Sequence, residues 1–143
     1  MNDLKRILGI DYGDSRIGVA VSDPMGIIAN GLETVSSKNN FNNAVEAIAE
    51  ICRKYEVNTA VVGYPKNMNG TLGERTVKTD GFINALLEKC GNLEIVKWDE
   101  RLTSVEAHKT MRETNVSTRR KGKGIVDKIA AELILQGYLD SKK

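Results

Sequence analysis

Apolar residues gather in short runs in the first third of the chain. Runs at 7–10 and 17–21 are separated by turn-forming residues, a pattern that predicts two β-strands joined as a hairpin. A turn at 23–26 follows, and a third strand is predicted from Ile27 towards Val35. The chain is therefore expected to open with three antiparallel strands.

Beyond residue 40, apolar positions recur at steps of three and four, which is the spacing of an amphipathic helix. This spacing predicts a helix from Phe41 to Tyr55, capped by Asn39 or Asn40. A second helix is predicted over about 74–89, ended by Gly91. Its inward side chains are expected to be Val77, Phe82, Ile83, Leu86 and Leu87.

The later segments alternate strands with helices. The β-branched run 59–62 predicts a buried parallel strand, and 94–98 supplies another. A short helix is predicted over 104–112, and a final one over 126–139. The inward face of the final helix is expected to consist of Ile129, Ala130, Leu133, Ile134 and Tyr138.

This order of elements predicts an α/β fold. Right-handed crossovers would place the two later strands parallel to the first, on its side away from the hairpin. We therefore expect a five-stranded mixed sheet of order 3-2-1-4-5, flanked by helices. The 143 residues contain no repeat or linker that would divide them, so a single domain over 1–143 is predicted.

Composition narrows the class of protein. No apolar run approaches the ~18 residues of a membrane span, and the N-terminus lacks a signal-peptide pattern, so we expect a cytoplasmic protein. Cys52 and Cys90 match no zinc or redox spacing and are predicted to be reduced core residues. The net charge of +2 does not make the whole chain a binder of polyanions.

Carboxylates follow strands at several points. Asp11 ends the first strand, Asp99 and Glu100 follow the fifth, and Asp127 lies in the predicted first turn of the last helix. Ligands of open α/β sheets bind beyond the carboxyl ends of the strands, where connections leave towards opposite faces. These acids are therefore expected to converge, although the pattern does not separate Asp99 from Glu100.

Convergent carboxylates repel one another, so a fold that gathers them binds divalent cations there or keeps a proton. Two such ions can activate water and stabilise the leaving oxygen of a phosphodiester. The sequence thus indicates magnesium-dependent phosphate chemistry without a histidine or cysteine nucleophile. Each acid also has an ordinary interpretation: Asp11 suits a hairpin turn, and Asp127 suits the start of a helix.

Basic and amide side chains lie near these acids in the sequence. The run Arg119, Arg120, Lys121 and Lys123 precedes Asp127 and is predicted to bind a phosphate backbone, although such runs are commonly solvated loops. The Pro65–Gly73 loop, with Lys66 and Asn67, leaves the sheet at the predicted ligand-binding edge. Arg101 either holds a substrate phosphate or pairs with Glu100.

With these residues placed, the chain resembles the YqgF-type family of the ribonuclease H-like superfamily. Its members are described as pre-16S rRNA nucleases and Holliday-junction-resolvase-like proteins. The resemblance covers nearly the whole chain and rests on five ordered motifs: GIDYG at 9–13, RIGVAVSD at 16–23, VGYP at 62–65 with NMNG at 67–70, DERLT at 99–103 and VDKIAA at 126–131.

The resemblance implies a ribonuclease H-like fold and a nuclease that uses Mg²⁺ or Mn²⁺. It implies that Asp11, Glu100 and Asp127 are the catalytic, metal-binding acids, and it favours Glu100 over Asp99. The implied substrate is the 5′ end of precursor 16S ribosomal RNA, with pre-ribosomal particles as further partners. We expect a monomer or weak homodimer with no membrane association.

Other functions fit parts of the pattern. A Holliday junction resolvase would use the same acids on four-way DNA junctions and would need two active sites, usually in a twofold dimer. A noncatalytic RNA- or ribosome-binding factor on the same fold is a third interpretation. An ATP-dependent phosphotransferase is disfavoured, because such proteins bind nucleotide between two lobes and no Walker-type loop is present.

Overall fold

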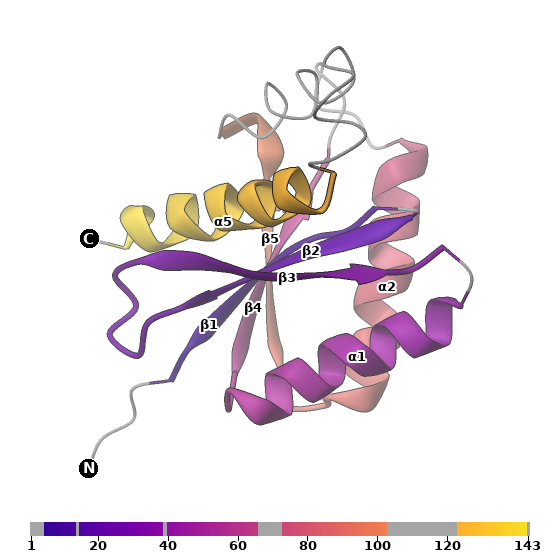
Figure 1. The fold of residues 1–143 in the computed structure, drawn as a ribbon, viewed down its shortest axis with the longest axis horizontal. Coiled ribbons are helices and arrows are strands. Elements are labelled where there is room, and N and C mark those ends of the chain that lie inside the picture. The colour runs from indigo at the N-terminus through magenta and orange to yellow at the C-terminus, as the bar shows by residue number, and fades with distance from the viewer. Residues whose placement is uncertain (1–4, 14, 39, 66–72, 103–122, 143) are drawn as a thin grey trace.

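The chain folds into three layers, with a mixed β-sheet between helices on either face (Figure 1). The computed structural model describes residues 5–13, 15–38, 40–65, 73–102 and 123–142. The sheet has the order β3-β2-β1-β4-β5, as predicted from the crossover rule. Strand β2 pairs antiparallel with both β1 and β3, whereas β4 and β5 run parallel to β1.

The strands begin and end close to the predicted positions. They are β1 Ile7–Asp11, β2 Arg16–Ser22, β3 Ala29–Ser36, β4 Thr59–Tyr64 and β5 Glu94–Asp99. The third strand starts two residues later than expected because the carboxylate of Asp23 accepts the backbone N–H groups of Ile27 and Ile28, each at 2.8 Å. These two residues therefore complete the turn instead of joining the sheet ladder.

Within the described residues, three helices flank the sheet: α1 Phe41–Lys54, α2 Glu74–Lys89 and α5 Lys123–Ser141. Asn40 caps α1 by accepting the N–H of Asn43 at 2.9 Å, which settles the choice between the two asparagines. A 3-10 turn, η1 Glu100–Leu102, follows β5 and was not predicted. The predicted helix over 104–112 lies outside the described residues. No helix in the described part of the chain is long and apolar enough to cross a membrane.

The inward face of α2 differs from the prediction at one position. Val77 is 68% exposed, whereas Thr76 and Thr79 are buried in its place. A threonine can be buried in a helix when its hydroxyl bonds locally, and Thr79 Oγ1 donates to the Arg75 carbonyl at 2.8 Å. The prediction was wrong here because it allowed only apolar residues on the buried stripe.

The start of α5 also differs from the prediction. The helix begins at Lys123, so Asp127 lies beyond its first turn, and the expected stabilisation of Asp127 by the helix N-terminus does not hold. The prediction placed the start at the first apolar residue of the stripe. The helix instead begins about one turn before Val126, on its N-terminal side. Val126 is the first buried residue among the described side chains of α5.

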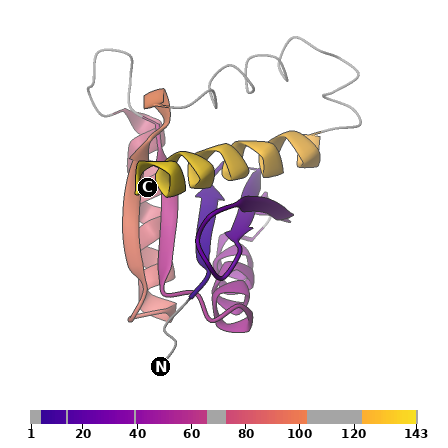
Figure 2. The ribbon, with the colours of Figure 1, turned by 90° about the vertical axis from the view of Figure 1, so that its left-hand side faces the viewer.

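Each face of the sheet has its own hydrophobic core. Helices α1 and α2 cover one face, on which alternate strand residues such as Leu8, Ile10 and Val62 pack with Phe82. Helix α5 covers the other face, where Ala20 and Val61 meet Ile134 and other α5 residues. Figure 2 shows α5 lying across the strands on the side away from α1 and α2.

The sheet surface beneath α5 contains a glycine in each of four neighbouring strands, namely Gly9, Gly18, Gly31 and Gly63. We call these four residues the glycine floor. A methyl group at Gly9 would lie 2.6 Å from Cβ of Leu135, and one at Gly18 would lie 2.0 Å from the carbonyl oxygen of Asp127. Both distances are too short for carbon, so α5 can lie this close to the sheet only over glycine.

We expect Gly18→Ala to destabilise the protein by about 3 kcal/mol, because the backbone of α5 would have to move away from β2. Gly81→Ala is the matched control, since no atom lies within 4 Å of the added methyl and the site is inside α2. That variant should gain about 0.5–1 kcal/mol from helix propensity. Urea denaturation measures both changes, and similar shifts in the two variants would contradict the glycine floor.

Candidate functional site

Asp11 is the last residue of β1 and its side chain belongs to the α5 face of the sheet. Side chains alternate along a strand, so Asp11 shares a face with Gly9, which lies against α5. Asp11 pairs across the ladder with Gly18 of β2 and is only 4% exposed. A carboxylate is thus held almost out of water where β1 ends.

Glu100 reaches the same face from β5. It is 1% exposed, and its Oε2 would lie 2.7 Å from a methyl group added at Gly63 of β4. Asp99, by contrast, is partly exposed. Because side chains alternate along β5, Asp99 shares a face with Ile95 and Lys97, and both of these lie on the α2 face. The structure therefore separates these two neighbouring acids, and Glu100 is the one that lies on the face of Asp11.

Asp127 is brought to this face by α5. The backbone of Asp127 lies directly over Gly18, the ladder partner of Asp11. Asp127 is only 4% exposed. Its Oδ2 accepts a 2.7 Å charge-assisted hydrogen bond from Nε of Arg16, at the start of β2. This ion pair joins α5 to the sheet at its carboxyl edge.

The structure thus places the three predicted acids at one end and on one face of the sheet, each almost completely buried. Buried carboxylates require compensating partners, and their oxygen atoms are the donors that Mg²⁺ prefers. The donor chemistry therefore suits a hard divalent cation. Among the described residues, however, no three His, Cys, Asp or Glu side chains form a group that could hold a metal ion.

The structure describes few of the predicted substrate-binding residues. Lys66, Asn67, Arg119, Arg120 and Lys121 lie outside the described residues. Arg101 lies within η1 and Lys123 is the first residue of α5, but their side chains are not among those described. Their assignment as binding residues stays a prediction.

Two features near the acids were missed by the sequence analysis. Arg16 pairs with Asp127 across 111 residues of sequence, and no local pattern indicates such a partner. A small cavity of about 90 Å³ also lies beside the end of β1, and its lining includes Arg75 and Lys78 of α2. These two residues were predicted only as part of a helix.

A polar cluster fastens α2 to the sheet on the face opposite α5. The hydroxyl of Tyr64 donates to Oδ2 of Asp80 at 2.8 Å, and Nζ of Lys97 lies 3.0 Å from Oδ1 of the same residue. Burial, followed by the bond to Asp80, raises the pKa of Tyr64. The hydrogen bond to Asp80 likewise raises the pKa of Lys97. The phenol and the ammonium group therefore keep their protons around neutral pH, which preserves the cluster.

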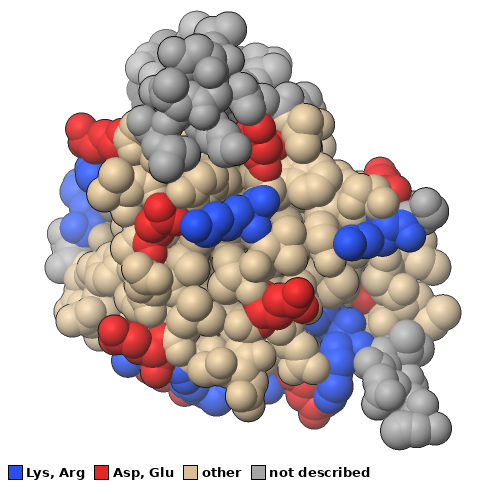
Figure 3. All heavy atoms as spheres, turned by 180° about the vertical axis from the view of Figure 1, so that it is seen from behind, with Lys and Arg blue, Asp and Glu red and all other residues tan. Residues whose placement is uncertain are grey.

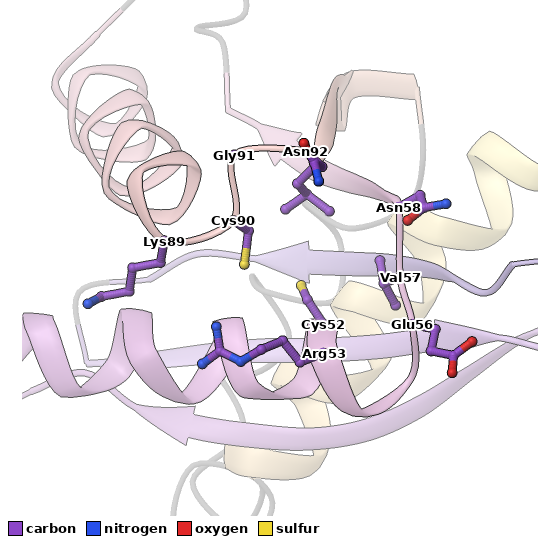
Figure 4. Close-up of a pocket in the computed structure, with 10 residues that line it drawn as sticks. Cys52, Arg53, Glu56, Val57, Asn58, Lys89, Cys90, Gly91 and Asn92 are labelled. Carbon is purple, nitrogen blue, oxygen red and sulfur yellow. The ribbon is translucent and has the colours of Figure 1, made fainter.

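A larger cavity, of about 330 Å³, lies where α1 and α2 end and β4 and β5 begin (Figure 4). The thiols of Cys52 and Cys90 point towards each other there, and both are free thiols, as predicted. Burial, together with the neighbouring thiol of Cys90, raises the pKa of Cys52 to about 12. This cavity lies at the opposite end of the parallel strands from the three acids.

The layered arrangement is that of the RuvC-type, ribonuclease H-like fold. RuvC of Thermus thermophilus, solved in complex with a Holliday junction substrate, matches with a TM-score of 0.60 over 96% of this chain and 95% of the RuvC chain, at 13% identity. Another RuvC structure from the same organism gives a TM-score of 0.57 at 14% identity, over the same shares of the two chains. At these identities the likeness shows the fold alone.

The sequence itself shows the family. Residues 5–141 match the model of the RuvX family, which is described as Holliday junction resolvase, and the chain belongs to this family. A protein of Ruminiclostridium cellulolyticum named "Putative pre-16S rRNA nuclease" is 57% identical over 135 residues, or 94% of each chain. A protein of the same name from Acetivibrio thermocellus is 51% identical over 137 residues, or 96% of each chain.

The ion pair between Arg16 and Asp127 can be tested by a double-mutant cycle. Arg16→Gln should cost about 1–2 kcal/mol of unfolding free energy, because it leaves a buried carboxylate without this partner. The loss is below that of a fully buried pair, since the Arg16 side chain is 31% exposed. With Asp127→Asn as the second variant, we expect a coupling of about 1 kcal/mol in urea denaturation. Additive effects would show that the pair does not join α5 to the sheet.

The raised pKa of Cys52 predicts low reactivity. At pH 8 a thiol with a pKa of about 12 is ionised in roughly one molecule in ten thousand, and the thiolate is the reactive form. In a Cys90→Ser variant, folded protein should resist iodoacetamide at pH 8, while urea-unfolded protein reacts readily, as mass spectrometry would show.

Because the pKa of Cys52 is higher in the folded state, its contribution to stability should be lost as pH rises from about 9 to 12. Rapid labelling of the folded Cys90→Ser variant at pH 8 would contradict the raised pKa of Cys52, on which both predictions rest.

Proposed function

We propose that the protein is a metal-dependent nuclease that hydrolyses phosphodiester bonds and processes the 5′ end of precursor 16S ribosomal RNA. The observation that supports this best is the placement of Asp11, Glu100 and Asp127, three almost fully buried acids, on one face at the carboxyl edge of the sheet. The names of relatives that share more than half of its sequence support the RNA substrate.

In this proposal, Asp11, Glu100 and Asp127 hold Mg²⁺ or Mn²⁺ through their carboxylate oxygens. A bound ion would supply a Lewis acid and would lower the pKa of an attacking water. The chain's own contribution is to hold the acids in place. Arg16 orients Asp127, and the close approach of α5 to the glycine floor keeps the carboxylates out of bulk water.

The remaining elements of the proposal concern the substrate. The residues predicted from the sequence to bind the nucleic-acid backbone are Lys66, Asn67, Arg101, Arg119, Arg120, Lys121 and Lys123. The proposed protein is a single nuclease domain over 1–143 that acts in the cytoplasm as a monomer or weak homodimer. Its substrate would be free precursor RNA or the RNA of pre-ribosomal particles.

A second candidate is a Holliday junction resolvase. The description of the RuvX family favours it, and the fold is also that of a RuvC solved with a Holliday junction. The same three acids would cut the DNA strands. Paired cuts require two active sites, so this function would need a dimer at working concentrations.

Asp11→Asn tests the proposal. The change keeps the size of the side chain but removes its charge, so it should lower cleavage of a 5′-extended precursor 16S RNA by at least about 100-fold in Mg²⁺ or Mn²⁺. Asp99→Asn is the matched control, since Asp99 adjoins Glu100 but lies on the α2 face, and it should cleave at nearly the wild-type rate. A labelled four-way DNA junction is assayed in parallel, and circular dichroism checks that each variant is folded.

The outcomes separate the candidates. Cleavage of the precursor RNA that is lost in Asp11→Asn and kept in Asp99→Asn supports the processing nuclease. Cleavage confined to the DNA junction favours the resolvase instead. If folded wild-type protein cuts neither substrate, or if Asp11→Asn is fully active, the proposed catalytic role of the acids is wrong and a noncatalytic binding function is favoured.

A further inference from the structure

We propose that the small cavity beside the end of β1 binds a backbone phosphate of the substrate strand, next to the phosphate that is cut. This inference rests on the proposed function, because it takes nucleic acid as the ligand. The cavity of about 90 Å³ is lined by Tyr12, Gly13, Arg75, Lys78 and Thr79. It is smaller than the roughly 300 Å³ or more of typical organic-ligand pockets, which suits a single ionic group.

The position of the cavity relates it directly to the acids. Tyr12 and Gly13 follow Asp11 in the chain, so the cavity adjoins the proposed cleavage site. Side chains alternate between the faces of the sheet, and Tyr12 packs with the α1–α2 core while Asp11 belongs to the α5 face. A strand of nucleic acid that crosses this edge of the sheet would therefore pass from the acids to the cavity.

The charge of the cavity favours an anion. Among the lining residues that the structure describes, Arg75 and Lys78 are cationic and none is acidic. Lys78 forms an ion pair with Glu74 at 3.5 Å, but both side chains are largely exposed, at 46% and 84%. An exposed pair of this kind contributes little, so a phosphate can replace Glu74 at small cost. Arg75 adds a planar group whose geometry suits two phosphate oxygens at once.

Three of the lining residues, Tyr12, Gly13 and Thr79, are held in place by contacts within the protein. The ring of Tyr12 stacks on that of buried Phe82, with 4.9 Å between centroids. A methyl group at Gly13 would lie 2.8 Å from the Arg16 carbonyl, so the backbone forms a tight wall there. Thr79 is buried and bonds to the carbonyl of Arg75. A preformed site loses less conformational freedom on binding.

Several other basic residues of the described chain pair with nearby acids. Arg53 and Lys89, which line the cavity of Figure 4, both pair with Glu46, at 2.6 and 3.3 Å. On the face shown in Figure 3, acidic and basic side chains are mixed, and no large patch of one sign is visible. The described residues of this face thus form no broad basic surface, and the cavity beside Asp11 is a candidate for a local anion site.

The test measures binding without cleavage. All proteins carry Asp11→Asn and are kept in EDTA, and fluorescence anisotropy follows a labelled 5′-extended fragment of precursor 16S RNA and a four-way DNA junction over 50–200 mM salt. Arg75→Gln with Lys78→Gln should weaken binding about tenfold. It should also lower the slope of log Kd against log salt by roughly 0.7–0.9, as expected for one lost phosphate contact.

The control removes the same charge elsewhere. Lys54→Gln with Lys142→Gln alters the ends of α1 and α5, where each lysine lies over a tyrosine ring. This variant should bind within about twofold of the parent and keep its salt slope. Equal weakening in the two double variants would overturn the phosphate site, because net charge alone would then explain the effect. Unchanged binding in the cavity variant would overturn it too.

Kinetics in the wild-type background then separates this inference from the proposed function. Loss of the cavity cations should raise KM several-fold and leave kcat nearly unchanged, because these residues bind substrate away from the reacting atoms. If the wild type does not cleave either substrate but the cavity variant alone binds weakly, the nuclease proposal fails and the phosphate site stands. If cleavage is confirmed and the cavity variant binds normally, the reverse holds.

Discussion

The close approach of α5 to the sheet is the constraint on which the rest of the structure depends. A helix normally packs on a sheet through side chains on both surfaces, but here the backbone of Asp127 meets the backbone of Gly18. The absence of side chains on the glycine floor shortens this distance. As a result, an acid on a helix, an acid at the end of β1 and an acid after β5 share one buried region, although Asp11 and Asp127 are 116 positions apart in the sequence.

Much of the fold was predictable because local patterns and topology agree. The alternation and stripe patterns gave α1, α2 and every strand to within about two residues, and the crossover rule gave the sheet order. Two of the errors arose where a polar side chain formed a local hydrogen bond with the backbone, which a pattern of hydrophobic residues does not encode. Asp23 held Ile27 and Ile28 in the turn, and Thr79 took an inward position through its own hydrogen bond.

The candidate site was predictable only in part. Acids at strand ends indicated the neighbourhood, since topology determines which strand ends meet. The family resemblance favoured Glu100 over Asp99, but the local pattern alone could not separate them without knowing where β5 ends and η1 begins, because one residue of shift moves a side chain to the other face. The partner of Asp127 and the neighbours of Tyr12 are set by tertiary packing between distant segments, so no local pattern could identify Arg16, Arg75 or Lys78.

The glycine floor also links the stability of the fold to the affinity of the site. Asp127 belongs to α5 and Asp11 to β1, so any ligand that binds both carboxylates favours the state in which the helix is seated on the sheet. Conversely, a change that lifted the helix by a fraction of an ångström would separate the acids and would weaken the binding of such a ligand, with every carboxylate still present. In the proposed nuclease, the glycines would thus act on the ligand without touching it, through the distance between two layers.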